Sequence, residues 1–183
     1  MSEALDTALA QLADDCGIQL EYHDIWGNLH RASAEPVRAL LAAFGVDAGD
    51  PAGALVARNQ TRWSRWLEPV LLASAEQSAL IVRVNVPKEE RRAPLRWEIE
   101  SEDGAPRSGD FVPAECPELE RAEFDGRTLV AYSLRIEDLP FAGYHELRLV
   151  DRAGRTRGTA RLLVAPPRCY RPPALEERRL WGP

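Results

Sequence analysis

The spacing of hydrophobic residues changes once along the chain, near residue 67. Before that point apolar residues recur every three or four positions, which predicts helices. After it they alternate with polar residues, which predicts strands. The pattern therefore predicts an α+β protein, in which a small N-terminal helical subdomain is followed by an antiparallel immunoglobulin-like β-sandwich.

Three helices are predicted in the first part. The first ends at Gly17, a typical residue just beyond a helix C-terminus. The second begins after Ser33, a good N-cap, and the third begins at Asp50-Pro51 and runs toward Trp66. Between the first two helices, residues 18–22 are extended and residues 23–28 form a polar turn. The positions expected on the buried helix faces are Leu5, Ala8, Leu9, Leu12, Cys16, Val37, Leu40, Leu41, Phe44, Leu55, Val56, Trp63 and Trp66.

Strands dominate the second part, because every second residue in several segments is apolar. Polar residues between them, such as Arg83 and Asn85, are expected on the solvated face. One apolar face per strand, without intervening helices, favours an antiparallel sandwich. A tight hairpin is expected at residues 151–155. The clear strands are 80–86, 95–100, 128–136, 145–149 and 160–164, and weaker ones near 70–73 and 109–112 make about seven.

We therefore expect three parts: a helical subdomain over residues 1–67, a sandwich over 68–166 and a proline-rich linker over 167–183. Two Pro-Pro pairs, at 166–167 and 172–173, cannot lie in a central strand. Residues 174–180 could form a short helix.

Composition narrows the function classes. The net charge of −6 disfavours a general nucleic-acid binder, which needs clustered cations. No apolar run approaches the length of a membrane span, and residues 1–6 lack the features of a signal peptide, so we expect a cytoplasmic protein. Three cysteines without a CxxC pair indicate unpaired thiols in a reducing compartment.

No catalytic or metal-binding motif is present. The three histidines lack the spacing of a metal pair, and no GxSxG, GxGxxG or Walker pattern occurs. His145 shares a strand face with Leu147 and Leu149, which favours a core or interface histidine. Glu98 and Glu100 lie two residues apart on the polar face of a strand, so the pair is most simply solvated surface. We assign no catalytic, cofactor-binding or metal-binding residue.

Tryptophan is the one unusual feature, with five in 183 residues. Trp97 lies on the apolar side of its strand and is expected in the core. Trp63 and Trp66 are three residues apart on a helix, which favours packing between the helices and the sandwich over ligand binding. Trp26 stands in a polar turn and is the least explained. Trp26, Trp63 and Trp66 are therefore the candidate platforms for stacking sugar rings.

Three separated stretches resemble one enzyme family. Residues 22–35, YHDIWGNLHRASAE, followed by LLAAFG at 40–45, look like the opening of bacterial 4-α-glucanotransferases. These enzymes are also called amylomaltases or disproportionating enzymes, of glycoside hydrolase family seventy-seven. LPFAGYHEL at 139–147 resembles their sandwich-domain motif. LVAPPRCYRP at 163–172 with RLWG at 179–182 resembles the junction into their catalytic (β/α)8 barrel.

The resemblance implies a helical part, then an immunoglobulin-like sandwich, and a barrel that begins about where this sequence ends. The family's two catalytic aspartates and its acid/base glutamate lie in that barrel, so none maps onto this chain. The implied reaction breaks an α-1,4 bond of a maltodextrin and passes the glucan to another sugar, without a metal or organic cofactor. The implied partners are the chain's own barrel and α-1,4-glucans; nucleic acid and membrane are not expected, on the charge and hydropathy given above.

Three hypotheses remain open for the segment. In the first, the segment is a structural part of a larger enzyme and docks on the barrel of that enzyme. In the second it is a glucan-binding module, and in the third it is a protein-interaction or dimerisation domain that uses a free sheet edge. All three predict that residues 1–183 alone are inactive.

Overall fold

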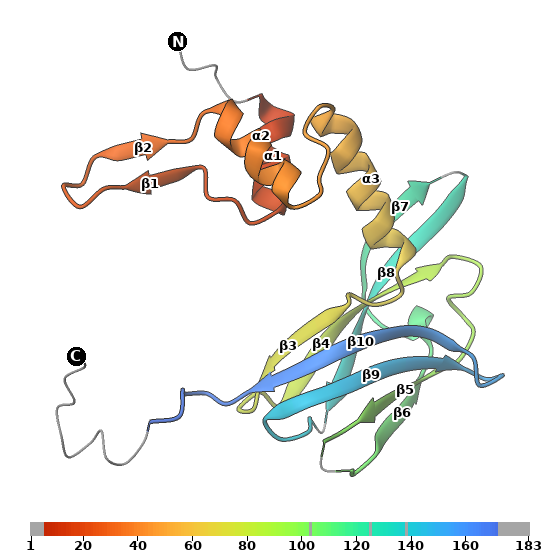
Figure 1. The fold of residues 1–183 in the computed structure, drawn as a ribbon. Coiled ribbons are helices and arrows are strands. Elements are labelled where there is room, and N and C mark those ends of the chain that lie inside the picture. Colours follow the sequence, from red (N-terminus) through yellow and green to blue (C-terminus); the bar gives the residue numbers. More distant parts are fainter. Residues whose placement is uncertain (1–5, 103, 125, 138, 172–183) are drawn as a thin grey trace. The chain divides into compact units, whose positions relative to one another are not determined.

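The computed structural model describes residues 6–102, 104–124, 126–137 and 139–171 (Figure 1). The chain divides into two compact units, Met1–Ser64 and Arg65–Pro183. Each unit has its own buried cluster of apolar side chains. The predicted position Leu5, the second Pro-Pro pair and the predicted helix at 174–180 lie outside the described residues.

The first unit contains three helices, α1 (Thr7–Asp15), α2 (Ala34–Ala43) and α3 (Pro51–Ser64), and a two-stranded hairpin, β1 (Glu21–His23) and β2 (Leu29–Arg31). Asp6 caps α1 by accepting a hydrogen bond from the Ala8 N–H at 3.4 Å. Ser33 precedes α2, as predicted, but its side chain makes no capping hydrogen bond. The buried cluster consists of Leu9, Leu12, Ala13, Ala34, Val37, Leu41 and Ala48.

The buried faces of α2 and α3 are narrower than the sequence predicts. Leu40 on α2 is exposed, and so are Phe44, the residue after α2, and Val56 on α3. The reason is that α2 packs through a single stripe at Ala34, Val37 and Leu41, which leaves the adjacent row of the helix uncovered. The second strand of the hairpin, β2, was not predicted, because residues 29–31 are too short to show alternation.

The second unit is a β-sandwich of two sheets. Its elements are β3 (Val70–Ser74), β4 (Ala79–Pro87), β5 (Leu95–Glu100), β6 (Arg107–Phe111), the 3-10 helix η1 (Pro113–Glu115), β7 (Glu118–Phe124), β8 (Arg127–Glu137), β9 (Gly143–Asp151) and β10 (Thr156–Ala165). One sheet has the strand order β3-β10-β9-β5-β6, and the other has the order β4-β8-β7. Both weak strands are therefore present.

Strand pairing is antiparallel throughout the described sandwich except between β3 and β10, which are parallel. The prediction of a purely antiparallel sandwich is wrong at this pair. No hairpin joins the first strand to the last, so their relative direction is not constrained by a short turn. Strand β7 was also missed, because its sequence ELERAEF has charged residues on both faces and so shows no clear alternation. Every residue of this strand is exposed or half-buried.

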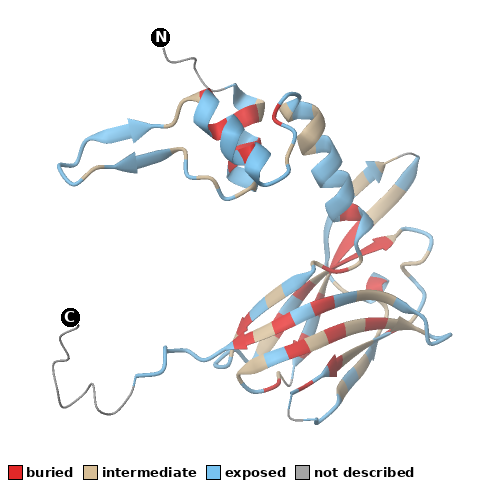
Figure 2. Cartoon of the chain, in the orientation of Figure 1, coloured by how far each residue is buried: buried red, intermediate tan, exposed pale blue. Residues whose placement is uncertain are grey.

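The alternation predicted for the sandwich strands is confirmed. Leu80, Val82, Val84 and Val86 of β4 all point into the core, and Figure 2 shows buried residues recurring along the central strands. Asn85 differs from the prediction because it is buried rather than solvated. Its side-chain amide donates to the Arg65 carbonyl oxygen at 2.9 Å, and its backbone N–H donates to the Trp66 carbonyl oxygen at 3.0 Å. These bonds satisfy a polar group that would otherwise be costly to bury.

Candidate functional site

Among the described residues of the first unit, the β1–β2 hairpin presents the most exposed apolar side chains. All six residues of its two strands are exposed, as Figure 2 shows. At its turn, Ile25 is 89% exposed and Trp26 is 79% exposed. Burying such side chains would stabilise the molecule, so their exposure at one turn marks a candidate contact surface.

A carboxylate holds the turn in one conformation. Asp24 Oδ1 accepts hydrogen bonds from the backbone N–H groups of Trp26 and Asn28, each at 2.9 Å. Asp24 Oδ2 lies 3.0 Å from both the Asn28 side-chain amide nitrogen and His30 Nε2. Gly27 has a positive φ of 85°, a conformation that glycine adopts without strain. The turn is therefore preorganised although solvent surrounds it.

The same contacts stabilise the charged form of Asp24. The hydrogen bond with His30, followed by the bond with the Asn28 side chain, lowers the pKa of Asp24 from 3.8 to about 2. Asp24 therefore stays a carboxylate at a lower pH than an ordinary aspartate does. On the strands, the rings of Tyr22 and His30 stack with their centres 5.1 Å apart and their planes inclined by 16°. This places His30 between an aromatic face and a carboxylate.

The three candidate tryptophans are in different surroundings. Trp26 is at the exposed hairpin turn, and Trp63 on α3 is only 3% exposed. Trp66 is half-buried in the second unit, where the Arg157 guanidinium carbon lies 4.3 Å from the ring centre. Arg157 also pairs with Glu90 and, at 3.7 Å, with Asp151. Trp26 thus has the most accessible ring, and binding of glucan by any of the three stays a prediction.

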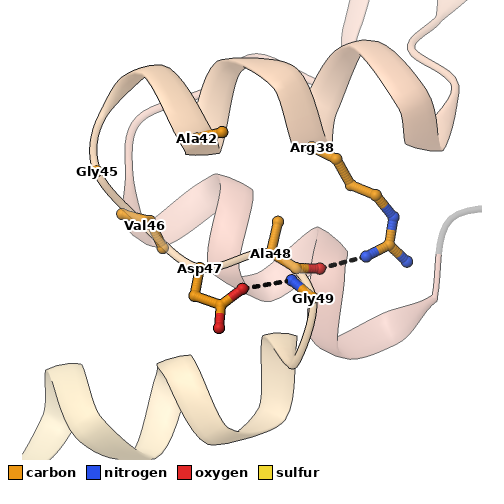
Figure 3. Close-up of a pocket in the computed structure, with 7 residues that line it drawn as sticks. All are labelled: Arg38, Ala42, Gly45, Val46, Asp47, Ala48 and Gly49. Atoms are coloured by element: carbon orange, nitrogen blue, oxygen red, sulfur yellow. Dashed lines mark hydrogen bonds between the residues drawn. The ribbon is translucent and has the colours of Figure 1, made fainter.

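A depression of about 530 Å³ lies at the loop between α2 and α3, lined by Arg38, Ala42, Gly45, Val46, Asp47, Ala48 and Gly49 (Figure 3). Its two charged side chains already bond to the loop. Arg38 donates to the Ala48 carbonyl oxygen, and Asp47 accepts from the Gly49 N–H at 2.8 Å. These bonds explain why the loop keeps its shape, and they favour a structural role for both residues.

A second recess, of about 350 Å³, lies where β5 ends beside β9 and β10. His145 is buried at its wall, in agreement with its predicted place on the core face. The Glu102 N–H donates to His145 Nδ1 at 3.4 Å, so the proton lies on Nε2, which donates to the Phe141 carbonyl oxygen at 2.9 Å. Both ring nitrogens are therefore used by the fold.

The acidic residues of this recess are also engaged. Glu100 pairs with Arg148 at 3.3 Å, and Glu146 lies 3.9 Å from the same guanidinium. Glu102 accepts a hydrogen bond from the Tyr144 N–H at 3.1 Å. Glu98 and Glu100 lie on the outer face of the sheet, since the core residues Leu95 and Ile99 occupy the other face. These contacts favour structural roles for the carboxylates.

Metal binding and thiol chemistry receive no support from the described part of the chain. Among those residues, no group of three or more His, Cys, Asp or Glu side chains is arranged to hold a metal ion. Cys16, Cys116 and Cys169 are free thiols, which confirms the prediction of unpaired cysteines. Burial raises the pKa of the Cys116 thiol, which makes it less reactive. None of the helices in the described residues is long and apolar enough to cross a membrane.

Comparison with known proteins gives consistent matches. The family model of the MalQ N-terminal beta sandwich domain matches residues 66–166. The 4-alpha-glucanotransferases of Mycobacterium bovis and of two strains of Mycobacterium tuberculosis are 31% identical over 188 residues, which covers 97% of this chain and 24% of theirs. The chain thus spans about a quarter of the length of these relatives.

The fold also matches a solved structure. The crystal structure of amylomaltase from Corynebacterium glutamicum superposes with a TM-score of 0.65 at 24% identity, over 88% of this chain and 23% of that one. At this identity the match is a likeness of fold.

Proposed function

The chain belongs to the family of MalQ N-terminal β-sandwich domains, and from this we propose that it is the N-terminal, non-catalytic region of a 4-α-glucanotransferase. The observation that carries the proposal is the alignment with the mycobacterial enzymes. It includes almost the whole of this chain and only 24% of theirs. The proposed whole enzyme acts in the cytoplasm and transfers α-1,4-glucan segments between maltodextrins.

The proposed accessory role rests on what glycosyl transfer requires. A retaining mechanism uses two carboxyl groups on opposite sides of the scissile bond, one as nucleophile and one as acid/base. The acids around the second recess are instead tied to Arg148 and to the Tyr144 backbone. We therefore assign the chemistry to the part of the longer enzyme beyond this region, and assign to this region the support of that part.

An activity assay tests the proposal. Residues 1–183 are incubated with maltotriose, and released glucose and longer maltodextrins are measured against an enzyme-free control. We expect no turnover from residues 1–183 and turnover from a gene product that continues into a catalytic domain. Glucose release by residues 1–183, after removal of contaminating activity, would show that the region is not accessory.

A second candidate function is glucan binding at the hairpin, because Trp26 is exposed on a preorganised turn. Aromatic stacking contributes about 0.5–1.5 kcal/mol, so Trp26→Ala should weaken maltoheptaose binding about 2- to 10-fold in isothermal titration. Phe44→Ala, at another exposed aromatic residue of the same unit, is the matched control. Equal affinities of the wild type and both variants would reject the hairpin as the binding site, and the same titration can be made with Trp63→Ala and Trp66→Ala.

We also infer that the helices form a separate subdomain, since they lie in the first compact unit, Met1–Ser64. We infer further that the sandwich is of the immunoglobulin type, which three features of its topology support. The consecutive strands β4 and β5 lie in different sheets, and so do β8 and β9. The first strand, β3, pairs with the last. Such crossings between sheets are typical of Greek-key sandwiches.

A further inference from the structure

The outer face of the five-stranded sheet carries a row of exposed apolar residues. Leu72 on β3 is in register with Leu163 on β10, and Leu163 is in register with Tyr144 on β9. Leu72 is 73% exposed, Tyr144 is 61% exposed and Leu163 is half-buried. Val70, two residues before Leu72, lies on the same face and is also exposed. These four residues are called the outer patch below.

The patch lies on the face opposite to the core. The neighbouring residues Ala73 and Val164 are buried, and a strand turns successive side chains to opposite faces. On a solvated outer face polar residues are expected. Single exposed apolar residues are ordinary, but here three strands place theirs side by side. A contiguous apolar area of this kind is typical of an interaction surface.

The second recess borders the outer patch and places negative charge beside its apolar residues. Tyr144 belongs to both, and the recess is also lined by Glu100, Glu102, Glu146 and Arg161. Arg148 pairs with Glu100 and Glu146. The recess therefore has three carboxylates against two guanidinium groups, those of Arg148 and Arg161, and keeps an excess of negative charge. A matching surface would place apolar side chains on the patch and a basic side chain at the recess.

The course of the chain indicates the occupant. Strand β10 ends at Ala165, two residues beyond Leu163, and the following segment leaves the sheet at this end of β3 and β10 (Figure 1). The Ala75 N–H donates to the Ala165 carbonyl oxygen at 2.9 Å, so the exit point is anchored to the strand that carries Leu72. In the mycobacterial relatives about three quarters of the polypeptide lies outside the matched region. Polypeptide joined directly to the exit has a high effective concentration at the patch.

We propose that the outer patch is the surface on which the sandwich docks the polypeptide that follows it in the whole enzyme, namely its catalytic part. This inference rests on the proposed function. It names the contacting face: Val70, Leu72, Leu163 and Tyr144 cover an apolar area of the catalytic part, and the acidic recess accepts a basic side chain from it.

Hydroxyl-radical footprinting tests the proposal. The oxidation rates of Leu72 and Tyr144 are compared between residues 1–183 and the complete gene product. If the patch is docked in about nine of ten molecules, these rates fall about tenfold in the complete product. Ile81, an exposed aliphatic residue on the outer face of the other sheet, is the control and should be oxidised equally in both.

A pair of variants gives an independent readout. Leu72→Glu and Ile81→Glu should both leave the thermal unfolding of residues 1–183 unchanged, since both side chains are exposed there. In the complete product, Leu72→Glu should restore oxidation of Tyr144 and lower the melting temperature, whereas Ile81→Glu should do neither.

Each other outcome has a definite meaning. Equal oxidation of the patch in both proteins overturns the docking proposal, even when the complete product transfers glucan and the proposed function stands. Patch protection in a product without transferase activity refutes the proposed function and leaves the docking surface in place. A gene product that ends at Pro183 overturns both.

Protection already present in residues 1–183 also overturns the docking proposal. In a dimer by light scattering it indicates a second copy as the occupant, and in a monomer it indicates the N-terminal unit.

Discussion

Leu162 and Leu163 are adjacent on β10 and have the same side chain, but they point to opposite faces of the sheet. Leu162 is 0% exposed and is in register with Leu71 and His145, whereas Leu163 is half-buried in the outer patch. Leu162→Ala removes three fully buried carbon groups, worth about 0.8 kcal/mol each, or about 2.4 kcal/mol. The cavity left behind adds to this, so we expect a loss of about 3 kcal/mol. Leu163→Ala should cost less than about 1 kcal/mol.

Urea unfolding of residues 1–183 followed by circular dichroism measures this difference. With a slope of about 1.5–2 kcal/mol per molar urea, Leu162→Ala should move the midpoint down by about 1.5–2 M, and Leu163→Ala by less than about 0.7 M. Equal midpoints for the two variants, or a larger shift for Leu163→Ala, would refute the assignment of the inner and outer faces. It would also remove the basis of the proposed docking surface.

Three further predictions concern single contacts. Gly109→Ala on β6 should destabilise the sandwich by about 1–3 kcal/mol in the same urea assay, because the new Cβ would lie 2.7 Å from Trp97 Nε1; wild-type stability would contradict this packing. Asp24 has a pKa of about 2 in the folded hairpin against an ordinary 3.8, so it stabilises the hairpin fully above pH 3.8 and progressively less as the pH falls toward 2. Hairpin amide signals in NMR should therefore shift with a midpoint near pH 2, and a midpoint near 3.8 would disprove the network. Arg157→Ala should cost about 1–2 kcal/mol through the lost contact with Trp66 and should shift that ring's fluorescence to longer wavelength, whereas an unchanged spectrum would argue against the contact.

The alternation of apolar residues was sufficient to locate most strands of the sandwich. In β4, Leu80, Val82, Val84 and Val86 repeat every second position, and all four are buried. With this period all four apolar side chains lie on one face of the strand. A shift of the strand register by one residue would move all of them from the core to the solvent-facing side. The core face of β4 could therefore be predicted without knowledge of its neighbours. The family resemblance likewise depends on local motifs, which are read directly from the sequence.

Features that depend on neighbouring segments were decided by the tertiary structure. The polar strand β7 exists because β8 supplies its hydrogen-bonding partners, and its own composition contains no signal for it. Strand β3 is parallel to β10 although the two are the first and last strands of the sandwich. The Asp24 network required the hairpin to bring His30 back beside the turn. Periodicity specifies which face of a segment avoids water. Which strand lies beside it, whether the two run parallel or antiparallel, and which residues form the outer patch depend on contacts between residues far apart in sequence, because only folding brings their atoms together.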